Sequence, residues 1–274
     1  RILMNSSNGP IGLFDSGVGG LTVARAIARR LPKEDILYFG DTAHLPYGEK
    51  SPDSIRKFSI EIANHLIKKG AKIIVIACNS ASAIAYEFLS ENLDVPVFNV
   101  IDPIIQELEK YKSQNIGIWG TRATINSNVY QKKLKKSLPN AKVRSTATPL
   151  LVPLIEENQL NGNITESLIK YYLDQSEVND VHHLVLACTH YPLIASQISK
   201  QLKSRVKLLR TPSIVAEHLE IELKKMQLLK KDNSSINHHF TVSDITPTFK
   251  KIGKIFFGAG ITFEEENIWE SNSI

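Results

Sequence analysis

Residues 73–81 of this 274-residue chain read IIVIACNSA, and residues 183–192 read HLVLACTHYP. Each stretch is a short aliphatic run that ends in Ala-Cys and continues with small polar residues. Cys78 and Cys188 are the only two cysteines in the sequence. Such runs predict buried strands, and open α/β sheets bind ligands where a strand ends and the chain turns toward a helix. The sequence therefore places each thiol where a parallel sheet binds ligands.

Further matched segments indicate that the chain contains a duplication. Three more pairs of segments match: residues 11–16 with 116–121, residues 95–103 with 206–212 and, more weakly, residues 35–42 with 141–148. A repeat of this length indicates two copies of one domain, because solenoid repeats are shorter. We therefore expect Cys78 and Cys188 at equivalent places in two similar halves, presented to opposite sides of one ligand.

Strand-like runs alternate with helical patterns along the whole chain. This alternation predicts an α/β fold with two similar domains, each a mostly parallel sheet flanked by helices. We expect the domains to be related by a pseudo-two-fold axis, with the site between them. The expected helices are residues 21–30, 51–69, 81–91, 125–136 and 165–175, and the apolar tail at 249–257 and 268–269 is also expected to pack as helix. Residues 230–237 are polar and predict a connection.

Composition argues against several classes of protein. Apolar residues make up 42% of the chain and charged residues 22%, both ordinary for a globular protein. No apolar stretch approaches the length of a membrane span, so no membrane association is expected. Two cysteines in a chain of this length do not form a disulfide framework, which favours a reducing cytoplasm. No metal site is expected, because there is no C-x-x-C and at most one histidine stands near each thiol.

The net charge of +5 and the pI near 9.0 raise the question of nucleic-acid binding. The basic residues are concentrated in segments such as 132–136 and 224–231, where their spacing fits the solvated faces of amphipathic helices. No nucleic-acid-binding motif accompanies them. Nucleic acid is therefore not an expected partner.

Residues 15–20 read DSGVGG and lie between a predicted strand and a predicted helix. Glycines there let the backbone approach a ligand, and free N–H groups at a helix start favour an anion. The pattern fits neither the dinucleotide-binding G-x-G-x-x-G motif nor the P-loop, which disfavours a nucleotide. A tight strand–helix turn explains the glycines equally well. Asp15 favours function, because a carboxylate at a strand end is well placed for proton transfer.

The thiols and their neighbours also have structural explanations. A free cysteine is commonly a buried small hydrophobe, but two matched thiols followed by hydrogen-bonding residues favour reactivity. A redox disulfide would need the two sulfurs within bonding distance. His190 could tune the Cys188 thiol or bind the ligand. Glu156 is a weaker candidate, because an acidic helix start explains it equally well. The loop at 41–48 could line a pocket, although a Pro/Gly turn with a packed tyrosine is slightly favoured.

Four motifs, present together and in order, resemble those of the glutamate racemase family, in the cofactor-independent aspartate/glutamate racemase superfamily. They are FDSGVGGLTV at 14–23, PYG at 46–48, ACNSA at 77–81 and CTHYP at 188–192. The resemblance covers about residues 11–258. It implies two similar domains that face each other across a buried site. The first would be discontinuous, with residues 1–99 and 211–274, and the second would comprise residues 100–210.

The resemblance also implies roles for individual residues. Cys78 would deprotonate D-glutamate and Cys188 would deprotonate L-glutamate, with Asp15 and His190 assisting. The implied substrate contacts are Asp15, Ser16, Pro46, Tyr47, Gly48, Cys78, Asn79, Ser80, Thr121, Thr124, Cys188, Thr189 and His190. Ser80 stands where the family usually has threonine, and Arg210-Thr211-Pro212 replaces a segment that is often acidic. No cofactor is implied, so fixed hydrogen-bond donors and a dry pocket must stabilise the carbanion.

The implied protein is a cytoplasmic, homodimeric isomerase that interconverts L-glutamate and D-glutamate. Its D-glutamate would supply peptidoglycan synthesis, and hence cell-wall biogenesis and cell shape. The alternative within the superfamily is an aspartate racemase or a related two-thiol amino-acid racemase, which would share the fold and the bases but differ in pocket length. A nucleic-acid-binding protein is the alternative from a different class, and salt-dependent DNA binding without α-proton exchange would favour it.

Overall fold

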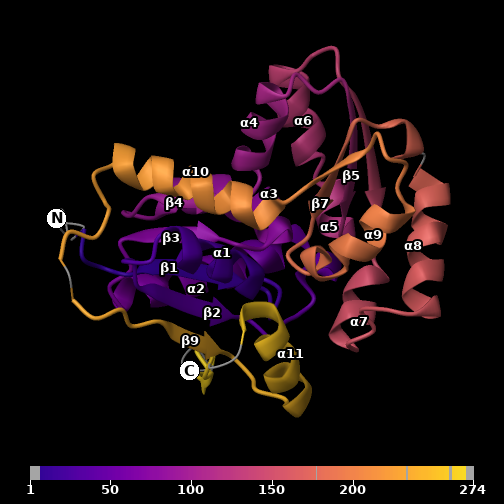
Figure 1. The fold of residues 1–274 in the computed structure, drawn as a ribbon. Coiled ribbons are helices and arrows are strands. Elements are labelled where there is room, and N and C mark those ends of the chain that lie inside the picture. The colour runs from indigo at the N-terminus through magenta and orange to yellow at the C-terminus, as the bar shows by residue number, and fades with distance from the viewer. Residues whose placement is uncertain (1–6, 177, 233, 259–260, 270–274) are drawn as a thin grey trace.

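Two parallel β-sheets flanked by helices form the framework of the protein (Figure 1). The computed structural model describes residues 7–176, 178–232, 234–258 and 261–269. The first sheet has the strand order β10-β9-β2-β1-β3-β4, and the second has the order β6-β5-β7-β8. Neighbouring strands in both sheets are parallel throughout the described chain. The predicted fold class is therefore confirmed.

The strands of the first sheet are β1 (Ile11–Asp15), β2 (Ile36–Gly40), β3 (Ile73–Ile76), β4 (Val97–Asn99), β9 (His239–Val242) and β10 (Glu264–Glu265). Those of the second are β5 (Asn115–Gly120), β6 (Lys142–Ala147), β7 (His183–Ala187) and β8 (Lys207–Leu209). The α-helices are α1 (Leu21–Arg30), α2 (Pro52–Lys68), α3 (Asn79–Asn92), α4 (Asp102–Lys110), α5 (Arg122–Asn126), α6 (Val129–Ser137), α7 (Leu151–Glu156), α8 (Asn163–Ser176), α9 (Ala195–Gln201), α10 (Thr211–Lys225) and α11 (Pro247–Phe257). Short 3₁₀ helices are η1 (Tyr47–Glu49), η2 (Val178–Asp180) and η3 (Tyr191–Ile194).

The duplication is visible in the strand order. The order β2-β1-β3-β4 in the first sheet is repeated as β6-β5-β7-β8 in the second. The pairing register repeats as well, because Ile11 lies beside Ile73 while Ile116 lies beside His183. The first sheet extends beyond this common unit through β9 and β10, which the last part of the chain supplies.

The weakest of the sequence matches has the wrong register. It aligns residues 35–42 with 141–148 and so sets Ile36 opposite Lys142. In the structure Ile36 pairs with Ile11 and Val143 pairs with Ile116, so Val143 is the equivalent of Ile36. Residues of β6 are exposed or half-buried, whereas β2 is fully buried. The edge strand therefore lacks the apolar pattern that would fix its alignment.

Most predicted helices are confirmed, with two corrections. The helix expected at 125–136 is two helices, because Asn128 has a left-handed backbone (φ 57°) between α5 and α6. Asparagine adopts that conformation more readily than most residues. Residues 268–269 form no helix, and Trp269 instead packs edge-on against His44. Residues 230–232 and 234–237 form no helix or strand, in agreement with the predicted connection, and residue 233 lies outside the described residues.

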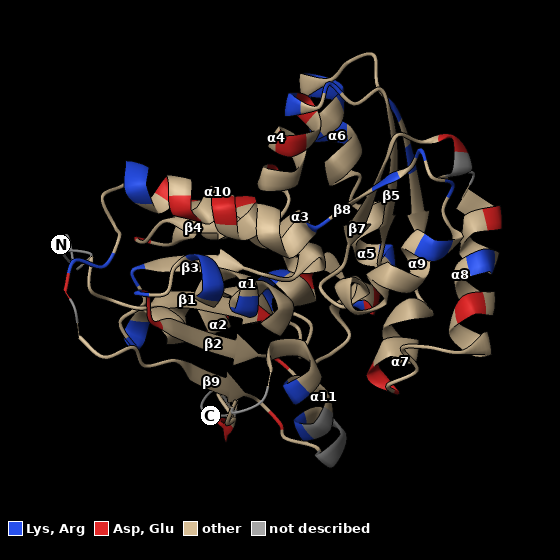
Figure 2. Cartoon of the chain, in the orientation of Figure 1, with Lys and Arg blue, Asp and Glu red and all other residues tan. Residues whose placement is uncertain are grey.

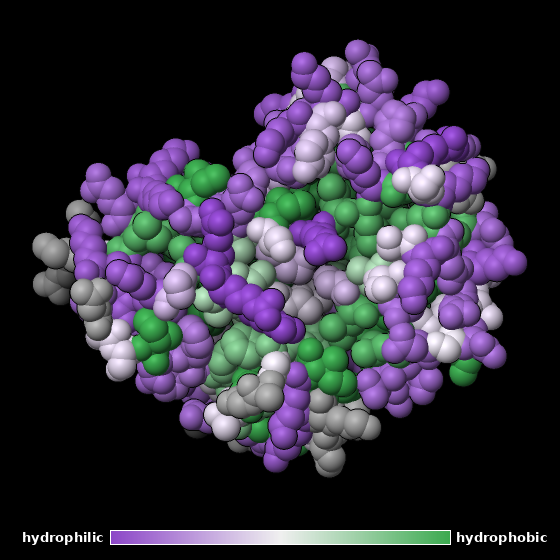
Figure 3. Space-filling model, viewed as in Figure 1, coloured by the Kyte–Doolittle hydropathy of each residue, from purple (hydrophilic) through white to green (hydrophobic). Residues whose placement is uncertain are grey.

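The two halves share hydrophobic packing. One buried cluster includes Leu13 and Val75 of the first sheet together with Leu184 and Leu186 of the second. In the face of the molecule shown in Figure 3, hydrophobic residues gather where the two halves meet, and hydrophilic residues surround them. Burial of apolar surface therefore holds the two sheets against each other and fixes the distance across the site.

Charges lie mainly on the helices. Figure 2 shows Lys and Arg on both halves, with Asp and Glu among them on α8 and α10. In the part of the chain that the structure describes, no helix is long and apolar enough to span a membrane. Within the same residues, no group of three or more His, Cys, Asp or Glu could hold a metal ion.

Candidate active site

The candidate site lies where the central strands of the two sheets end. Ala77 alone separates Cys78 from β3, and Cys188 directly follows β7. Both thiols are free and buried. Both line one cavity, to which residues of both halves contribute. The structure thus brings the two thiols to a single enclosed space at the carboxyl ends of the strands.

Most of the predicted site residues surround this cavity. Its lining comprises Ser16, Gly17, Pro46, Tyr47, Gly48, Cys78, Asn79, Ser80, Thr121, Val152, Glu156, Ala187, Cys188, Thr189 and His190. Asp15 and Thr124 do not line it but are buried behind residues that do. Gly17 belongs to the 15–20 turn, whose glycines were expected to let the backbone approach a ligand. Val152 and Ala187 were not predicted, because an apolar residue within a helix or strand carries nothing that marks it as a site residue. The cavity offers about 20 Å³ to the centre of a water-sized sphere, which is room for about one water molecule.

Cys78 stands at the start of α3, and the helix holds its sulfur. Sγ accepts the Ala81 N–H at 3.5 Å and lies 3.9 Å from Oγ of Ser16. Burial raises the pKa of Cys78 from its ordinary value of 9.0 to about 12, and the negative charge of Asp15 adds to this effect. The Ala81 and Ser16 hydrogen bonds oppose it. Cys78 is therefore a protonated thiol at neutral pH.

Cys188 has a different neighbour, the imidazole of His190. Sγ of Cys188 lies 3.8 Å from Nδ1 of His190, whose Nε2 lies 3.0 Å from Oε1 of Glu156. Burial lowers the pKa of His190, but the hydrogen bonds to Cys188 and Glu156 raise it more, so that it reaches about 10. His190 is therefore an imidazolium at neutral pH, flanked by the sulfur and the carboxylate.

The structural explanation given above for Glu156 is wrong. Glu156 is the last residue of α7 and does not begin a helix. Its carboxylate meets His190, which is 34 residues away in sequence. No local pattern could have revealed this contact, because it depends on the packing of α7 against the loop after β7.

Asp15 connects the two halves beneath the cavity. It ends β1 and is fully buried, and its carboxylate accepts the Gly17 N–H at 3.1 Å and the Thr189 hydroxyl at 3.3 Å. Burial raises the pKa of Asp15, while the charge of His190 and the hydrogen bonds lower it. Nearby, a side chain at Gly19 would overlap Thr189 and His190, so the first half approaches the second as closely as a glycine allows.

Three hydroxyl groups join the halves on the other side of the cavity. Oγ of Ser80 lies 2.8 Å from Oγ1 of Thr121, and Thr124 lies within hydrogen-bond distance of both. Thr121 also caps α5 by accepting the Thr124 N–H at 3.3 Å. A Cβ added to Gly48 would lie 2.7 Å from Cβ of Thr121, so the loop that carries Gly48 packs directly against this group. Hydroxyl groups can donate to or accept from a ligand, which suits both carboxylate and ammonium.

The start of α3 supplies further polar groups. Its N-terminal residues Asn79 and Ser80 line the cavity, and a helix start carries partial positive charge. Oδ1 of Asn79 accepts the hydroxyl of Tyr130 at 2.9 Å. That bond orients the amide, so its NH₂ is the group available to an anion.

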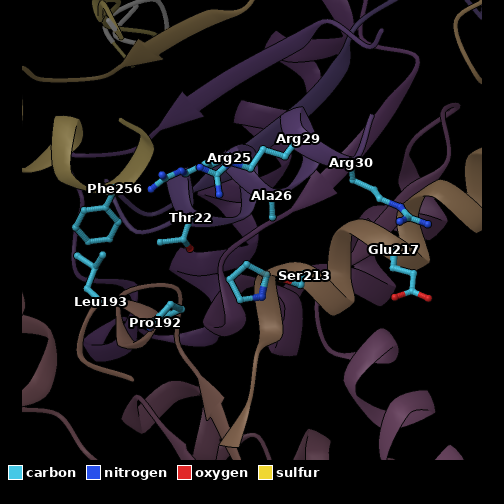
Figure 4. A pocket seen from close by; sticks show the side chains of 11 residues that line it. Thr22, Arg25, Ala26, Arg29, Arg30, Pro192, Leu193, Ser213, Glu217 and Phe256 are labelled. Atoms are coloured by element: carbon cyan, nitrogen blue, oxygen red, sulfur yellow. The ribbon is translucent and has the colours of Figure 1, made fainter. Parts of the chain in front are cut away.

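A larger hollow lies outside this site. It has a volume of about 550 Å³ and lies between α1 and α10, with Thr22, Arg25, Arg29, Arg30, Pro192 and Phe256 among its lining residues. Figure 4 shows its arginines on one wall and Ser213 and Glu217 on the other. It contains neither thiol and none of the predicted site residues. The smaller cavity, with both thiols, is therefore the candidate active site.

Comparisons with known proteins show which family the chain belongs to. The profile of the Asp/Glu/Hydantoin racemase family matches residues 11–219. Over 249 residues the chain is 41% identical to the glutamate racemase of Geobacter metallireducens, which covers 90% of this chain and 92% of that relative. The glutamate racemase of Aquifex pyrophilus is 43% identical over 249 residues, or 90% of this chain and 94% of that relative.

Comparison with solved structures gives the same family. The crystal structure of glutamate racemase from Francisella tularensis in complex with D-glutamate has a TM-score of 0.90 and 38% sequence identity, and the match covers 96% of this chain and 99% of that one. The aspartate racemase of Picrophilus torridus, with a TM-score of 0.53 and 18% identity over 81% of this chain and 100% of that one, shares the fold alone. The chain therefore belongs to the Asp/Glu/Hydantoin racemase family and, within it, to the glutamate racemases, which are isomerases.

Proposed function

We propose that the protein interconverts L-glutamate and D-glutamate without a cofactor, using Cys78 and Cys188 as two bases on opposite sides of the substrate α-carbon. The observation that carries this proposal is the pair of thiols, each at an equivalent strand end, in one cavity. Inversion through a planar carbanion needs a base on one face and an acid on the other, and these roles exchange in the reverse reaction.

In each direction one thiolate takes a proton from the α-carbon and the opposite thiol returns one. From D-glutamate, the Cys78 thiolate takes the α-proton, and the Cys188 thiol gives its proton to the opposite face of the carbanion. The product is L-glutamate, and the enzyme is left with a Cys78 thiol and a Cys188 thiolate. The reverse reaction exchanges the two roles. The protonated His190 stabilises the Cys188 thiolate through the 3.8 Å contact between Sγ and Nδ1.

Before the reaction from D-glutamate can begin, Cys78 must pass its proton to solvent and Cys188 must carry a proton. The Cys78 pKa of about 12 is set mainly by burial, with a contribution from Asp15. The substrate's α-ammonium brings a positive charge into the same space, and a nearby cation lowers the pKa of a thiol. Substrate binding therefore activates Cys78, whereas Cys188 has the His190 ring beside it, with Sγ 3.8 Å from Nδ1.

The remaining site residues hold the substrate. We assign Ser16, Asn79, Ser80, Thr121 and Thr189 to its carboxylates and ammonium, because their polar groups line the cavity. Thr124 holds the side chains of Ser80 and Thr121 in place through its hydrogen bonds to them. Preorganised donors of this kind stabilise the developing carbanion at little cost in reorganisation.

The biological role follows from the activity. We propose that the D-glutamate formed supplies peptidoglycan synthesis in the cytoplasm and that the protein is a homodimer, in line with its membership of the glutamate racemases. We also propose the division into a discontinuous first domain, residues 1–99 and 211–274, and a second domain, residues 100–210. The return of β9 and β10 to the first sheet supports this division. Light scattering during gel filtration tests the dimer.

The deciding experiment incubates the pure, reduced protein with D-glutamate in heavy water, without any added cofactor. Proton NMR follows the α-proton, and polarimetry follows optical rotation. We expect the α-proton signal to disappear while the rotation decays toward zero. Folded protein that exchanges the α-proton of aspartate but not that of glutamate would instead support an aspartate racemase. Exchange with neither amino acid would overturn the two-base proposal.

A further inference from the structure

The loop at 41–50 forms one wall of the candidate site. It leaves β2 at Asp41 and carries Pro46, Tyr47 and Gly48, which line the cavity. The closed cavity has room for about one water molecule, so this or another wall must move outward to admit an amino acid. The contacts that hold this loop in place therefore affect how tightly the cavity encloses a bound amino acid.

Asp41, at the base of the loop, makes contacts that hold the loop in place. Its carboxylate is fully buried and accepts the Tyr47 hydroxyl at 2.6 Å. It also accepts the Ser243 hydroxyl at 3.1 Å and meets Nδ1 of His44 at 3.0 Å. Its backbone N–H donates to the carbonyl of Asp15 at 3.0 Å. Asp41 thus joins the pocket wall, the strand end that carries Asp15 and the segment after β9.

Aromatic packing supports the same arrangement. The His44 ring stacks on Phe58 of α2 with 4.1 Å between centroids, and Trp269 meets it edge-on at 4.6 Å. Tyr47 is buried, and its ring lies 5.8 Å from that of Phe58. Burial and the neighbouring Asp41 hold the pKa of Tyr47 well above its ordinary value, so its hydroxyl keeps the proton that it donates.

The far end of the loop contacts the second half. Gly48 packs against Thr121, and Oε1 of Glu49 accepts from Nη1 of Arg122 at 2.8 Å. The loop therefore spans the cavity, with a buried attachment at Asp41 and an exposed one at Glu49. Exposed ion pairs contribute little, whereas buried hydrogen bonds to a charged group are strong. The position of the wall is thus set mainly from the Asp41 end.

We propose that Asp41 is a positioning residue, which holds Tyr47 and thereby closes the Pro46-Tyr47-Gly48 wall over the bound amino acid. The substrate part of this inference rests on the proposed function. Asp41 does not line the cavity, so it acts through Tyr47 and not on the reacting atoms. Its loss should weaken substrate binding more than it slows proton transfer.

The test compares Asp41→Asn, Tyr47→Phe and the double variant. The asparagine keeps the size of the side chain but replaces one acceptor oxygen by an NH₂ group, and the phenylalanine removes only the hydroxyl donor. We expect each single variant to raise KM for glutamate by about tenfold, the effect of about 1.4 kcal/mol, and to change kcat less. The double variant should match Asp41→Asn alone, because in this proposal Asp41 acts on substrate binding only through the Tyr47 hydroxyl. Additive effects, or a lower Tm with unchanged KM, would overturn the proposal.

A second measurement does not depend on turnover. Without substrate, the rate at which iodoacetamide alkylates Cys78, resolved by mass spectrometry, should rise severalfold in Asp41→Asn and in Tyr47→Phe. An unchanged rate in both variants contradicts the proposal even if the wild-type protein proves not to act on glutamate. Asp53→Asn is the matched control, because its side chain is exposed at the start of α2, and it should alter neither KM nor alkylation. If Asp41→Asn does not fold, Ser243→Ala with Tyr47→Phe repeats the test.

Discussion

The two halves provide the same strand order and the same thiol, but different electrostatic surroundings. Cys78 lies near Asp15 and a helix start, and its pKa is raised to about 12. Cys188 lies beside His190, an imidazolium held by Glu156. The duplicated scaffold therefore fixes where the thiols lie, and the unmatched side chains give the two thiols different charged neighbours. In the proposed two-base mechanism one thiol holds a proton while the other lacks it, and the two roles exchange in the reverse reaction.

Of the substitutions that test this difference between the halves, removal of either thiol should have the largest effect on the racemisation rate. Cys78→Ala should block the D-to-L direction most directly, and Cys188→Ala the L-to-D direction. Each should reduce racemisation by about 10²–10⁴-fold, the usual contribution of a general acid or base. Circular dichroism measures the rate from both enantiomers, and near-wild-type thermal melting shows that the fold is retained. Normal turnover in both variants would refute the two-base mechanism.

The Glu156→Gln substitution should weaken the support that His190 gives to Cys188. The hydrogen bond to Glu156 helps to raise the pKa of His190 to about 10, so the substitution should lower that pKa. The rate from L-glutamate should then fall by roughly tenfold at alkaline pH, as a hydrogen bond to a charged group is lost. NMR titration of labelled histidine measures the pKa directly.

Protonation of His190 should also make the stability of the fold depend on pH. The pKa of His190 in the folded protein lies above its ordinary value of 6.5. Its protonated form therefore stabilises the fold fully below about pH 6.5, and this contribution is lost as pH rises toward 10. The difference in free energy of unfolding between wild type and Glu156→Gln should shrink over that range. A difference that grows with pH would contradict the assignment.

Asp15→Asn should act on the other thiol. The charge of Asp15 raises the pKa of Cys78, so its removal should lower that pKa and speed alkylation of Cys78 severalfold in the empty site. Alkylation of Cys188, followed in the same mass spectra, provides the internal comparison and should change less. Equal acceleration of both thiols would indicate general opening of the cavity instead of a charge effect.

Substitutions at the amino ends of the strands, opposite the site, should have the smallest effect on the racemisation rate. Just before β3, Lys72 is buried and forms an ion pair with Glu34 at 2.5 Å, whereas at the start of β7 His183 bonds Ser113 at 2.8 Å. Glu34→Gln leaves a buried charge unpaired and should cost about 3–5 kcal/mol of stability. Ser113→Ala should cost about 1 kcal/mol. Urea unfolding measures both, and kcat at 25 °C should stay within about twofold of wild type, far from the effects of the catalytic variants. Equal costs would show that the halves are stabilised alike.

Much of the architecture could be predicted because buried parallel strands leave a continuous apolar pattern. The runs that became β3 and β7 fixed the fold class and the place of both thiols. The exposed edge strand β6 carries no such pattern, and its register was predicted one residue out. Glu156, Val152 and the buried role of Asp41 depend on contacts between distant segments. Local sequence does not encode which side chains from distant segments meet.

The absence of a side chain at Gly19 has an evolutionary consequence. Because Thr189 and His190 occupy the space that a side chain there would need, a larger residue at position 19 would require these side chains to shift. Duplicated domains ordinarily accumulate substitutions independently. At this contact, however, the side chains of one half limit which residue the other half can carry.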